Sequence, residues 1–245
     1  MDTPIHDPTV MRLQGFEGRV AVVTGAARGI GRRLCETLVS LGASTAAFDL
    51  IAPEIPRVVG VACDVTNAQA IDSAFSEVER KLGPVDILVI NAGVYIVEPF
   101  EQTTLASWRK TMSVNVDAAF LCAQRAITHM RERGYGRIVT IGSSAGITGG
   151  KRNSAAYGAS KAAVMTLAKA LANEFASHGI TANTVAPALI RTQMIEGMPD
   201  MSAQIPVGRY GEPEDVAAAV AFLCSAHASF ITGEVLDITG GFLID

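Results

Sequence analysis

The amino-acid sequence predicts one α/β domain, in which a doubly wound parallel sheet carries helices on both faces. Short apolar runs alternate with longer segments of helical periodicity along the chain. The runs are apolar at successive positions, which is typical of parallel strands that helices cover on both sides. The length of 245 residues and the lack of a linker-like stretch favour a single domain, residues 19–245, after an N-terminal extension, residues 1–18, on the surface.

Each predicted strand is a short run rich in apolar and β-branched residues. The runs are Val20–Thr24, Thr45–Asp49, Val58–Cys63, Ile87–Ile90, Ile138–Ile141, Thr181–Val185 and Val235–Ile238. The predicted helices between them are Gly29–Leu41, Ala68–Leu82, Leu105–Arg133, Ala155–Ser177 and Pro213–Cys224. A series of strand–helix–strand units of this kind builds a parallel sheet.

Two predicted helices carry apolar residues on more than one face. In Leu105–Arg133 these residues are Trp108, Met112, Val116, Ala119, Phe120 and Ala123, and Ala155–Ser177 shows the same distribution. Burial against a second copy of the chain would account for both helices, which predicts a homo-oligomer.

The longest late connection, residues 189–210, is predicted to be a substrate lid, because long loops in compact domains are often functional. Its apolar residues form a flexible set suited to adaptable contacts or to plain packing: Met194, Ile195, Met198, Met201 and Ile205. We expect further residues around the same pocket: Tyr95, Ile147, Thr148 and Ala188.

Charge and composition exclude several functions. The net charge is −4 and the pI about 5.6, without a block of Lys or Arg, which argues against nucleic-acid and membrane partners. The longest apolar run, Val216–Cys224, is too short for a membrane span. Acidic residues and prolines stand where a signal peptide would begin, which predicts a cytoplasmic protein. The four cysteines are dispersed, so we expect buried reduced thiols and no metal site.

A glycine-rich turn joins the first predicted strand to the first predicted helix. Its glycines are Gly25, Gly29 and Gly31 in the sequence TGAARGIG. Such a turn lets the backbone approach a pyrophosphate, and the helix N-terminus offers free amide groups to it. The same glycines could instead serve only the packing of a tight turn.

Polar residues follow the next three strands. Asp49 ends the second strand, where its carboxylate would accept hydrogen bonds from an adenosine ribose or would cap a loop. Asp64 and Val65 end the third strand, where they could reach the adenine, although Asp64 could also be solvated. The Asn-Ala-Gly sequence at 91–93 follows the fourth strand, either beside a cofactor or as a plain turn.

The strongest local signal for chemistry is the segment YGASK at 157–161. Tyr157 and Lys161 lie four residues apart, so they share a helix face and the ammonium can lie near the phenol. A nearby cation favours the phenolate and lowers the pKa of a tyrosine. Such a tyrosine can act as a general acid and base near neutral pH.

Polar residues elsewhere accompany this pair. Ser143 and Ser144 end the fifth strand, where ligands bind in open α/β sheets. A hydroxyl there could hydrogen-bond a substrate carbonyl or stabilise a turn. Asn115 lies inside a predicted helix, where its amide could hold a backbone carbonyl or a water, or make a neutral contact between helices.

Together these motifs resemble those of the classical short-chain dehydrogenase/reductase family, over residues 19–241. The matching segments are TGAARGIG, Asp64-Val65, NAG at 91–93, Asn115, the serine pair, YGASK and the late ITGEVLDITGG. The C-terminal part most resembles 3-oxoacyl-[acyl-carrier-protein] reductases and related alcohol and polyol dehydrogenases. The resemblance implies one Rossmann-type domain with seven parallel strands and a cytoplasmic homotetramer.

The resemblance also implies a catalytic tetrad of Asn115, Ser143, Tyr157 and Lys161. Tyr157 would transfer the proton, Lys161 would lower its pKa and bind the nicotinamide ribose, Ser143 would polarise the carbonyl, and Asn115 would hold a relay water. The residues implied to bind the cofactor are Gly25, Arg28, Gly29, Ile30, Gly31, Asp49, Asp64, Val65, Asn91, Ala92, Gly93, Tyr157, Lys161, Pro187, Ile190 and Thr192.

The chain departs from the family pattern in three places. Ile90 replaces the first residue of Asn-Asn-Ala-Gly, and Ala188 replaces the glycine that usually follows the proline of the sixth strand. The family commonly places its serine thirteen residues before the tyrosine, a spacing that fits Ser144, whereas Ser143 is fourteen residues away. We assign Ser143, because its place at the strand end with Gly146 three residues on fixes its geometry, and Ser144 is the alternative.

We therefore expect an NAD-dependent oxidoreductase that interconverts a small secondary alcohol and a ketone by hydride transfer. NAD is favoured over NADP because the Asp49 carboxylate would repel a 2′-phosphate, although Arg28 could pair with that phosphate. Two alternatives are a 3-oxoacyl thioester reductase and a non-catalytic dinucleotide-binding regulator. The presence of both Tyr157 and Lys161 argues against the regulator.

Overall fold

The sheet has seven parallel strands in the order β3-β2-β1-β4-β5-β6-β7. The computed structural model describes residues 13–150, 153–195, 197 and 200–244. The strands are β1 (Val20–Thr24), β2 (Ser44–Asp49), β3 (Val58–Ala62), β4 (Ile87–Ile90), β5 (Gly136–Ile141), β6 (Ile180–Pro187) and β7 (Val235–Ile238). The order reverses beside β1, whose neighbours are β2 and β4. Ligands of open α/β sheets bind beyond the carboxyl ends of the strands at such a point.

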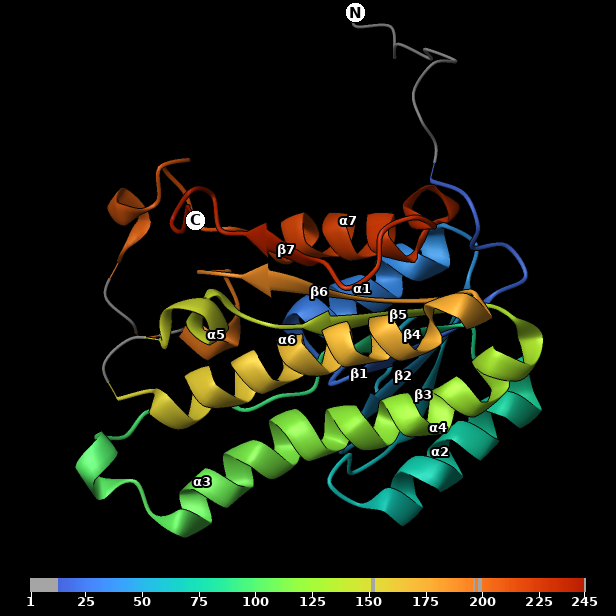
Figure 1. Cartoon of the computed structure of the whole chain (residues 1–245), viewed down its shortest axis with the longest axis horizontal. Coiled ribbons are helices and arrows are strands. Elements are labelled where there is room, and N and C mark those ends of the chain that lie inside the picture. The colour runs from blue at the N-terminus through green and yellow to red at the C-terminus, as the bar shows by residue number, and fades with distance from the viewer. Residues whose placement is uncertain (1–12, 151–152, 196, 198–199, 245) are drawn as a thin grey trace, which may run out of the picture.

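Helices cover both faces of the sheet (Figure 1). One face carries α1 (Gly29–Ser40) and α7 (Pro213–Cys224), and the other carries α2 (Ala68–Leu82), α4 (Ala118–Arg133) and α6 (Ala155–Phe175). Val22 and Val23, neighbours in β1, are fully buried in opposite cores. The strand is apolar at successive positions because both of its faces are covered. The predicted fold class is confirmed.

The predicted helix Leu105–Arg133 contains an irregular turn. It consists of α3 (Leu105–Met112), one π-helical turn (Ser113–Asp117) and α4. The backbone N–H of Ala118 donates to the carbonyl of Ser113, five residues earlier. Turns of this kind are frequent at functional sites, because they change the direction of side chains within a helix. Asn115 lies in this turn and is buried.

Residues 13–18 depart from the predicted surface extension at Phe16. Phe16 is 1% exposed and packs into the core beneath α1 and α7. The N–H of Ala226 also donates to the carbonyl of Gln14 at 2.8 Å. Residues 14, 15, 17 and 18 are exposed, as the predicted surface path requires, whereas Phe16 departs from that path because its large aromatic side chain fills part of the core. Residues 1–12 of the extension lie outside the described residues.

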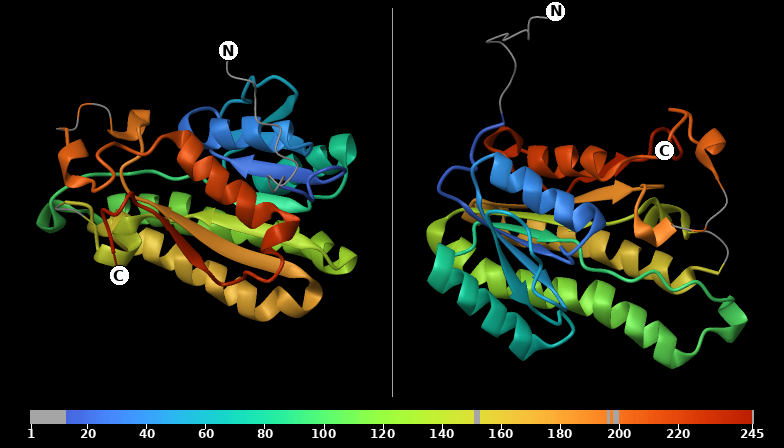
Figure 2. Two further views of the ribbon diagram at one scale, coloured as in Figure 1. Left: turned by 90° about the horizontal axis from the view of Figure 1, so that it is seen from above. Right: turned by 180° about the vertical axis from the view of Figure 1, so that it is seen from behind.

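Residues 189–210, the predicted lid, project beside the carboxyl end of β6 (orange in Figure 2). The segment contains two 3₁₀ turns, Gln193–Ile195 and Ser202–Gln204, while residues 196, 198 and 199 lie outside the described residues. It is attached to the start of α7 by ion pairs. Arg191 Nε donates to Glu212 Oε1 at 2.9 Å, and Arg209 Nη1 donates to Asp215 Oδ2 at 2.7 Å.

The cysteines are structural residues of the core. Cys35, Cys63, Cys122 and Cys224 are free and buried, which confirms the predicted buried thiols. Burial raises the pKa of Cys224 to about 12. Within the described ranges, no group of three or more His, Cys, Asp or Glu side chains could hold a metal ion. None of the helices described there is both long and apolar enough to cross a membrane.

Candidate active site

The turn between β1 and α1 leaves the start of α1 open to a ligand. Arg28 precedes the helix and makes no side-chain cap hydrogen bond. The free amides and the positive end of the helix dipole suit a pyrophosphate. The turn itself requires two of the glycines. Gly25 has φ +64°, a backbone conformation that favours glycine, and a Cβ on Gly31 would collide with the Gly25 carbonyl oxygen. The support for a dinucleotide site therefore comes from the uncapped amides rather than from the glycines.

Asp49 lies at the end of β2, against this turn. Its Oδ2 accepts a hydrogen bond from the N–H of Ala27 at 2.9 Å, and its Oδ1 accepts one from the N–H of Leu50 at 2.8 Å. The half-buried carboxylate is thus fixed where the adenosine ribose of a dinucleotide would lie. Arg28 is the residue expected to attract a 2′-phosphate and so to favour NADP. Its side chain reaches the lid segment, where Nη1 donates to Gln193 Oε1 at 2.8 Å.

The loop after β4 is bonded directly to the turn. Asn91 Nδ2 donates to the carbonyls of Thr24 and Gly25, at 3.0 and 2.8 Å. The N–H groups of Asn91 and Ala92 both donate to Thr24 Oγ1, each at 3.0 Å. The predicted Asn-Ala-Gly segment therefore holds the ends of β1 and β4 together beside the open helix end.

Lys161 is buried in α6 and points at the end of β5. It is 5% exposed, and its Nζ donates to the carbonyl of Ile141 at 2.6 Å. Gly93 brings bare backbone close to it, since a Cβ on Gly93 would lie 3.5 Å from Nζ. Burial lowers the pKa of Lys161 to about 8. An ammonium has three donors, so two N–H groups remain for other acceptors.

Tyr157 lies one helical turn before Lys161, as the spacing predicts. Its ring centroid is 5.7 Å from Lys161 Nζ, and the ring of Tyr95 packs edge-on against it at 4.8 Å between centroids. Burial raises the pKa of Tyr157, and a side-chain hydrogen bond with Ser143 opposes that rise. The expected lowering of the pKa by Lys161 is not found in this structure. The ammonium is directed at the Ile141 carbonyl, and loss of water around the phenol dominates.

The serine in contact with Tyr157 is Ser143. It precedes α5 (Ser144–Thr148), a short helix that the sequence analysis does not predict. Its Oγ accepts a hydrogen bond from the N–H of Ala145 at 3.1 Å and also hydrogen-bonds the side chain of Tyr157. Ser144 starts the helix, and its carbonyl accepts a hydrogen bond from Thr148 Oγ1 at 3.0 Å. This geometry favours Ser143 over Ser144 for the predicted role.

The side chain of Asn115 hydrogen-bonds the backbone of Val94 and a serine of the neighbouring helix α6. Its Oδ1 accepts from the N–H of Val94 at 2.8 Å, and its Nδ2 donates to the Val94 carbonyl at 3.1 Å and to Ser160 Oγ at 2.9 Å. Both Nδ2 donors are therefore used, which leaves one lone pair of Oδ1 for the predicted water. The described contacts make Asn115 the link between the loop after β4 and α6, where Tyr157 lies.

Thr192 and Pro187 lie at the same edge of the sheet as the turn. Pro187 ends β6. Thr192 lies against the glycine turn, since a Cβ on Gly29 would stand 3.4 Å from Thr192 Cγ2.

Four other predicted cofactor residues are less suited to direct contact through their side chains. Asp64 is exposed, and its Oδ1 accepts from the N–H and hydroxyl of Thr66 at 2.9 and 2.7 Å. These bonds lower the pKa of Asp64. Val65 and Ile190 are buried, at 8% and 5% exposed, and Ile30 packs against the core under α1 and α7. The side chains of Val65 and Ile190 are therefore buried, and that of Ile30 is partly buried.

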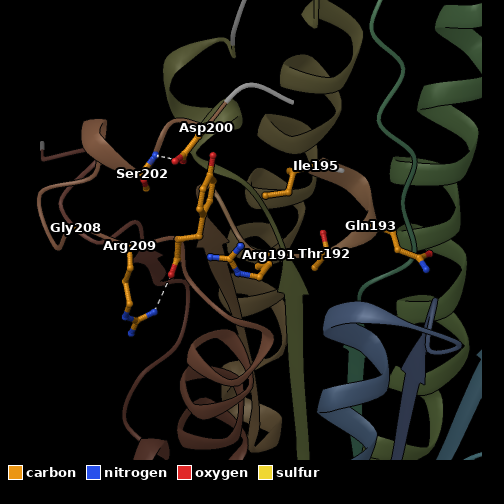
Figure 3. A pocket seen from close by; sticks show the side chains of 9 residues that line it. Arg191, Thr192, Gln193, Ile195, Asp200, Ser202, Gly208 and Arg209 are labelled. Carbon is orange, nitrogen blue, oxygen red and sulfur yellow. Dashed lines mark hydrogen bonds between the residues drawn. The ribbon is translucent and has the colours of Figure 1, made fainter. Parts of the chain in front are cut away.

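A pocket of about 550 Å³ lies within the lid segment (Figure 3). Its wall is polar and apolar in nearly equal parts and includes Arg191, Thr192, Asp200 and Ser202, together with Ile195 and Tyr210. Of the predicted apolar set, Ile195 lines the pocket and Ile205 is buried. Met194 is 50% exposed and is not among the lining residues, and Met198 lies outside the described residues.

Comparison with known proteins identifies the family. The family model described as "Enoyl-(Acyl carrier protein) reductase" matches residues 25–243. The "3-oxoacyl-[acyl-carrier-protein] reductase FabG" of Salmonella typhimurium is 40% identical over 239 residues, which cover 92% of this chain and 98% of that protein. The chain belongs to the short-chain dehydrogenase/reductase family.

Relatives of this short-chain dehydrogenase/reductase have names that span thioester and sugar substrates. The "Acetoacetyl-CoA reductase" of Rhizobium meliloti is 40% identical over 236 residues, covering 91% of this chain and 98% of that protein. The solved structure of Thermoplasma acidophilum aldohexose dehydrogenase matches with a TM-score of 0.87 at 32% identity, covering 93% and 96% of the two chains. The protein is an oxidoreductase, and its family binds a nicotinamide dinucleotide and acts on small molecules.

Two contacts of this site were not found by sequence reasoning. Ser160 Oγ accepts a hydrogen bond from Asn115 Nδ2. The only indication of this contact in the sequence is that Ser160 directly precedes Lys161 on the same helix. Gln193 bonds Arg28 across 165 residues of sequence. No local pattern reports such a long-range contact.

Proposed function

We propose that this short-chain dehydrogenase/reductase uses NAD to interconvert a secondary alcohol and a ketone. One observation carries the proposal: the contact of Ser143 with Tyr157, beside the buried Lys161 at the carboxyl edge of the sheet. The open start of α1 and the fixed Asp49 carboxylate lie at the same edge. When bound, NAD supplies the hydride acceptor for oxidation and, once reduced, the hydride donor for reduction.

Tyr157 is the proposed acid and base. In oxidation its phenolate takes the hydroxyl proton of the alcohol, and in reduction its phenol returns a proton to the carbonyl oxygen. Because Ser143 hydrogen-bonds Tyr157, the two hydroxyls lie close together, and one substrate oxygen beside them can hydrogen-bond to both. Ser143 would therefore hold the oxygen that gains or loses the proton.

Lys161 has two proposed tasks. Its two remaining N–H donors suit ribose hydroxyls, and its ammonium, 5.7 Å from the ring centroid of Tyr157, would favour the phenolate that forms when the proton is transferred. That charge is needed because burial raises the pKa of Tyr157. Asn115 positions this part of the site, since its amide ties the backbone of Val94 to Ser160 on α6.

The preference for NAD rests on Asp49. Its carboxylate is held against the turn at 2.9 Å from the N–H of Ala27, where it would accept hydrogen bonds from ribose hydroxyls and repel a 2′-phosphate. Arg28 would attract that phosphate, but its Nη1 is bonded to Gln193 at 2.8 Å.

A 3-oxoacyl thioester reductase is the second candidate, favoured by the names of two relatives at 40% identity. The experiment follows the absorbance of reduced nicotinamide with NAD(H) and NADP(H). The substrate panel contains secondary alcohols, ketones and a 3-oxoacyl thioester. We expect NAD reduction by a secondary alcohol, whereas turnover of the thioester alone supports the second candidate. NAD binding without turnover of any substrate supports the regulator and contradicts the proposal.

The proposal includes a homotetramer in the cytoplasm. Leu105 on α3 and Phe120 on α4 are 61% and 47% exposed, and a second copy would bury them. The four buried free thiols suit a reducing compartment.

A further inference from the structure

Tyr95 forms an aromatic pair with the proposed acid and base. It lies in the loop after β4, and its ring packs edge-on against that of Tyr157, with 4.8 Å between the centroids and 70° between the planes. Both side chains are half-buried. The pair is attractive because the positive edge of one ring meets the negative face of the other. The orientation of the Tyr157 ring therefore depends on a residue outside the proposed tetrad.

The backbone that carries Tyr95 is fixed by Asn115. Asn115 Oδ1 accepts a hydrogen bond from the N–H of Val94 at 2.8 Å, and its Nδ2 donates to the Val94 carbonyl at 3.1 Å. That carbonyl belongs to the planar peptide bond between Val94 and Tyr95. Asn115 is 2% exposed, so the Tyr95 ring extends from backbone that a buried amide holds in place.

The far end of the same loop is tied to the start of α6. The N–H of Glu98 donates to the carbonyl of Asn153 at 2.9 Å, and the Glu98 carboxylate accepts a hydrogen bond from Ser107 Oγ on α3. Asn153 lies two residues before α6 and four before Tyr157. In Figure 1 the loop passes the start of α6 on its way to α3. Residues 94–98 are thus held at both ends across the start of the helix that carries Tyr157.

Asn115 also reaches Tyr157 by a second route. Its Nδ2 donates to Ser160 Oγ at 2.9 Å, and Ser160 Oγ donates to the carbonyl of Tyr157 at 2.7 Å. The first route, through Val94 and Tyr95, ends on the ring of Tyr157. The second route, through Ser160, ends on its backbone. Together the two routes fix the side chain at its base and along its ring.

The hydroxyl of Tyr157 is the atom most sensitive to this support. It lies at the far end of the side chain, where Ser143 hydrogen-bonds it, so a small rotation of the side chain moves it further than any other atom of the residue. A displacement of about 1 Å at a reacting group can cost about 10²-fold in rate. The edge-to-face contact with Tyr95 restricts that rotation.

We propose that Tyr95 is a positioning residue, whose ring holds the Tyr157 phenol in place for proton transfer. This inference rests on the proposed function, in which Tyr157 is the acid and base. Because the contact is made by the ring, phenylalanine should replace Tyr95 and an aliphatic side chain should not. The alternative is that Tyr95 forms only a part of the pocket wall around the substrate, and the test distinguishes the two roles.

The contact also shapes the surroundings of the phenol. Burial raises the pKa of Tyr157, the hydrogen bond with Ser143 opposes that rise, and the nearby Tyr95 phenol adds to it. Lys161, 5.7 Å from the ring centroid, provides a positive charge on the same helix. A smaller side chain at position 95 would admit water while Lys161 and Ser143 remain, so the pKa of Tyr157 should fall. Oxidation requires the phenolate, and the acidic limb of kcat/KM against pH should therefore move to lower pH.

The test uses NAD, the full chain and one active secondary alcohol, with Tyr95→Phe, Tyr95→Leu and the control Tyr135→Leu. Tyr135 directly precedes β5, at the opposite edge of the sheet. It too is half-buried, with the Arg19 guanidinium 3.6 Å from its ring centroid. Tyr135→Leu therefore removes the same side chain from a packed position remote from Tyr157. Tyr95→Val repeats the experiment if Tyr95→Leu does not fold, and the Kd for NAD reports an intact cofactor site in every variant.

We expect Tyr95→Leu to lower kcat about tenfold, while the KM for the alcohol changes by less than about threefold. The acidic limb of its pH profile should move to lower pH. Tyr95→Phe should keep kcat within about twofold of the wild type and move the limb less. Tyr135→Leu should lower the free energy of unfolding in urea and leave both kcat and the pH profile unchanged.

Four results would overturn the inference and leave the proposed function standing. Unchanged kcat and pH profile in Tyr95→Leu would mean that the ring does not hold Tyr157. A higher KM without loss of kcat would make Tyr95 a part of the pocket wall only. Equal losses in Tyr95→Phe and Tyr95→Leu would assign the effect to the hydroxyl, and equal losses in Tyr135→Leu would assign it to stability. A wild type that reduces NAD with no secondary alcohol contradicts both the inference and the proposed function.

Discussion

Replacing Asp49 by Asn should shift the cofactor preference from NAD toward NADP. The substitution keeps the side-chain shape and one acceptor oxygen but removes the charge. In the wild type, hydrogen bonds from Ala27 and Leu50 at 2.9 and 2.8 Å hold the carboxylate in place, so it does not move freely away from a 2′-phosphate. Two like charges about 4 Å apart repel by about 4 kcal/mol at an effective dielectric constant near 20. Asp49 is half-buried, so solvent screens part of this repulsion. We expect at least about 1.4 kcal/mol of repulsion to remain, which is a tenfold preference for NAD.

The assay measures kcat/KM for NAD and for NADP with one active alcohol. Asp72→Asn is the control, because it removes the same charge from an exposed position on α2, where Asp72 pairs with Arg125 at 2.9 Å. The ratio of NAD to NADP efficiency should fall at least about tenfold in Asp49→Asn and stay unchanged in Asp72→Asn. A wild type that prefers NADP, or an unchanged ratio in Asp49→Asn, would refute the reasoning.

Three further predictions concern catalysis, pH dependence and assembly. Ser143→Ala should lower kcat by about 10²-fold and Ser144→Ala by less than about threefold in steady-state kinetics; the reverse order would mean that spacing to Tyr157 decides the serine. Burial lowers the pKa of Lys161 from 10.5 to about 8, so between these values the unfolded chain binds more protons than the folded chain. The free energy of unfolding of the wild type relative to Lys161→Met should therefore rise with pH from 8 to 10.5, by up to about 1.4 kcal/mol per pH unit. Urea titrations at several pH values check this, and a flat difference contradicts it. Phe120→Glu should weaken the proposed tetramer in sedimentation experiments, whereas a stable wild-type monomer at micromolar concentration would contradict the assembly.

The strands were largely predictable because helices cover both faces of the sheet. Each strand is therefore a short run that is apolar at successive positions. The predicted bounds of β1, β4 and β7 agree with the structure. β5 begins two residues earlier than predicted, at Gly136, because it includes the polar residue Arg137. Arg137 is 6% exposed, and its Nη1 donates to the carbonyls of Gly136 and Gly179 at 2.8 and 3.2 Å. Local polarity does not reveal a buried guanidinium that bonds backbone carbonyls only through Nη1, while its Nε has no hydrogen-bond partner.

The candidate site was predictable where it depends on local spacing. Tyr157 and Lys161 share a helix face because four residues separate them. The direction of the Lys161 ammonium toward the Ile141 carbonyl depends on the packing of α6 against β5, which spacing does not report. The short helix after Ser143 has too few residues to show a period. Burial, a property of the whole fold, raises the pKa of Tyr157, whereas the local spacing to Lys161 predicts a lowering.

The most direct test of the proposed chemistry is to compare turnover and NAD binding in Tyr157→Phe. The substitution removes the phenol oxygen and keeps the ring that packs against Tyr95 at 4.8 Å between centroids. We predict that kcat with an active secondary alcohol falls by 10²-fold or more, while the Kd for NAD changes by less than about threefold. A variant that retains more than about a tenth of the wild-type kcat would contradict the role of Tyr157 as the acid and base.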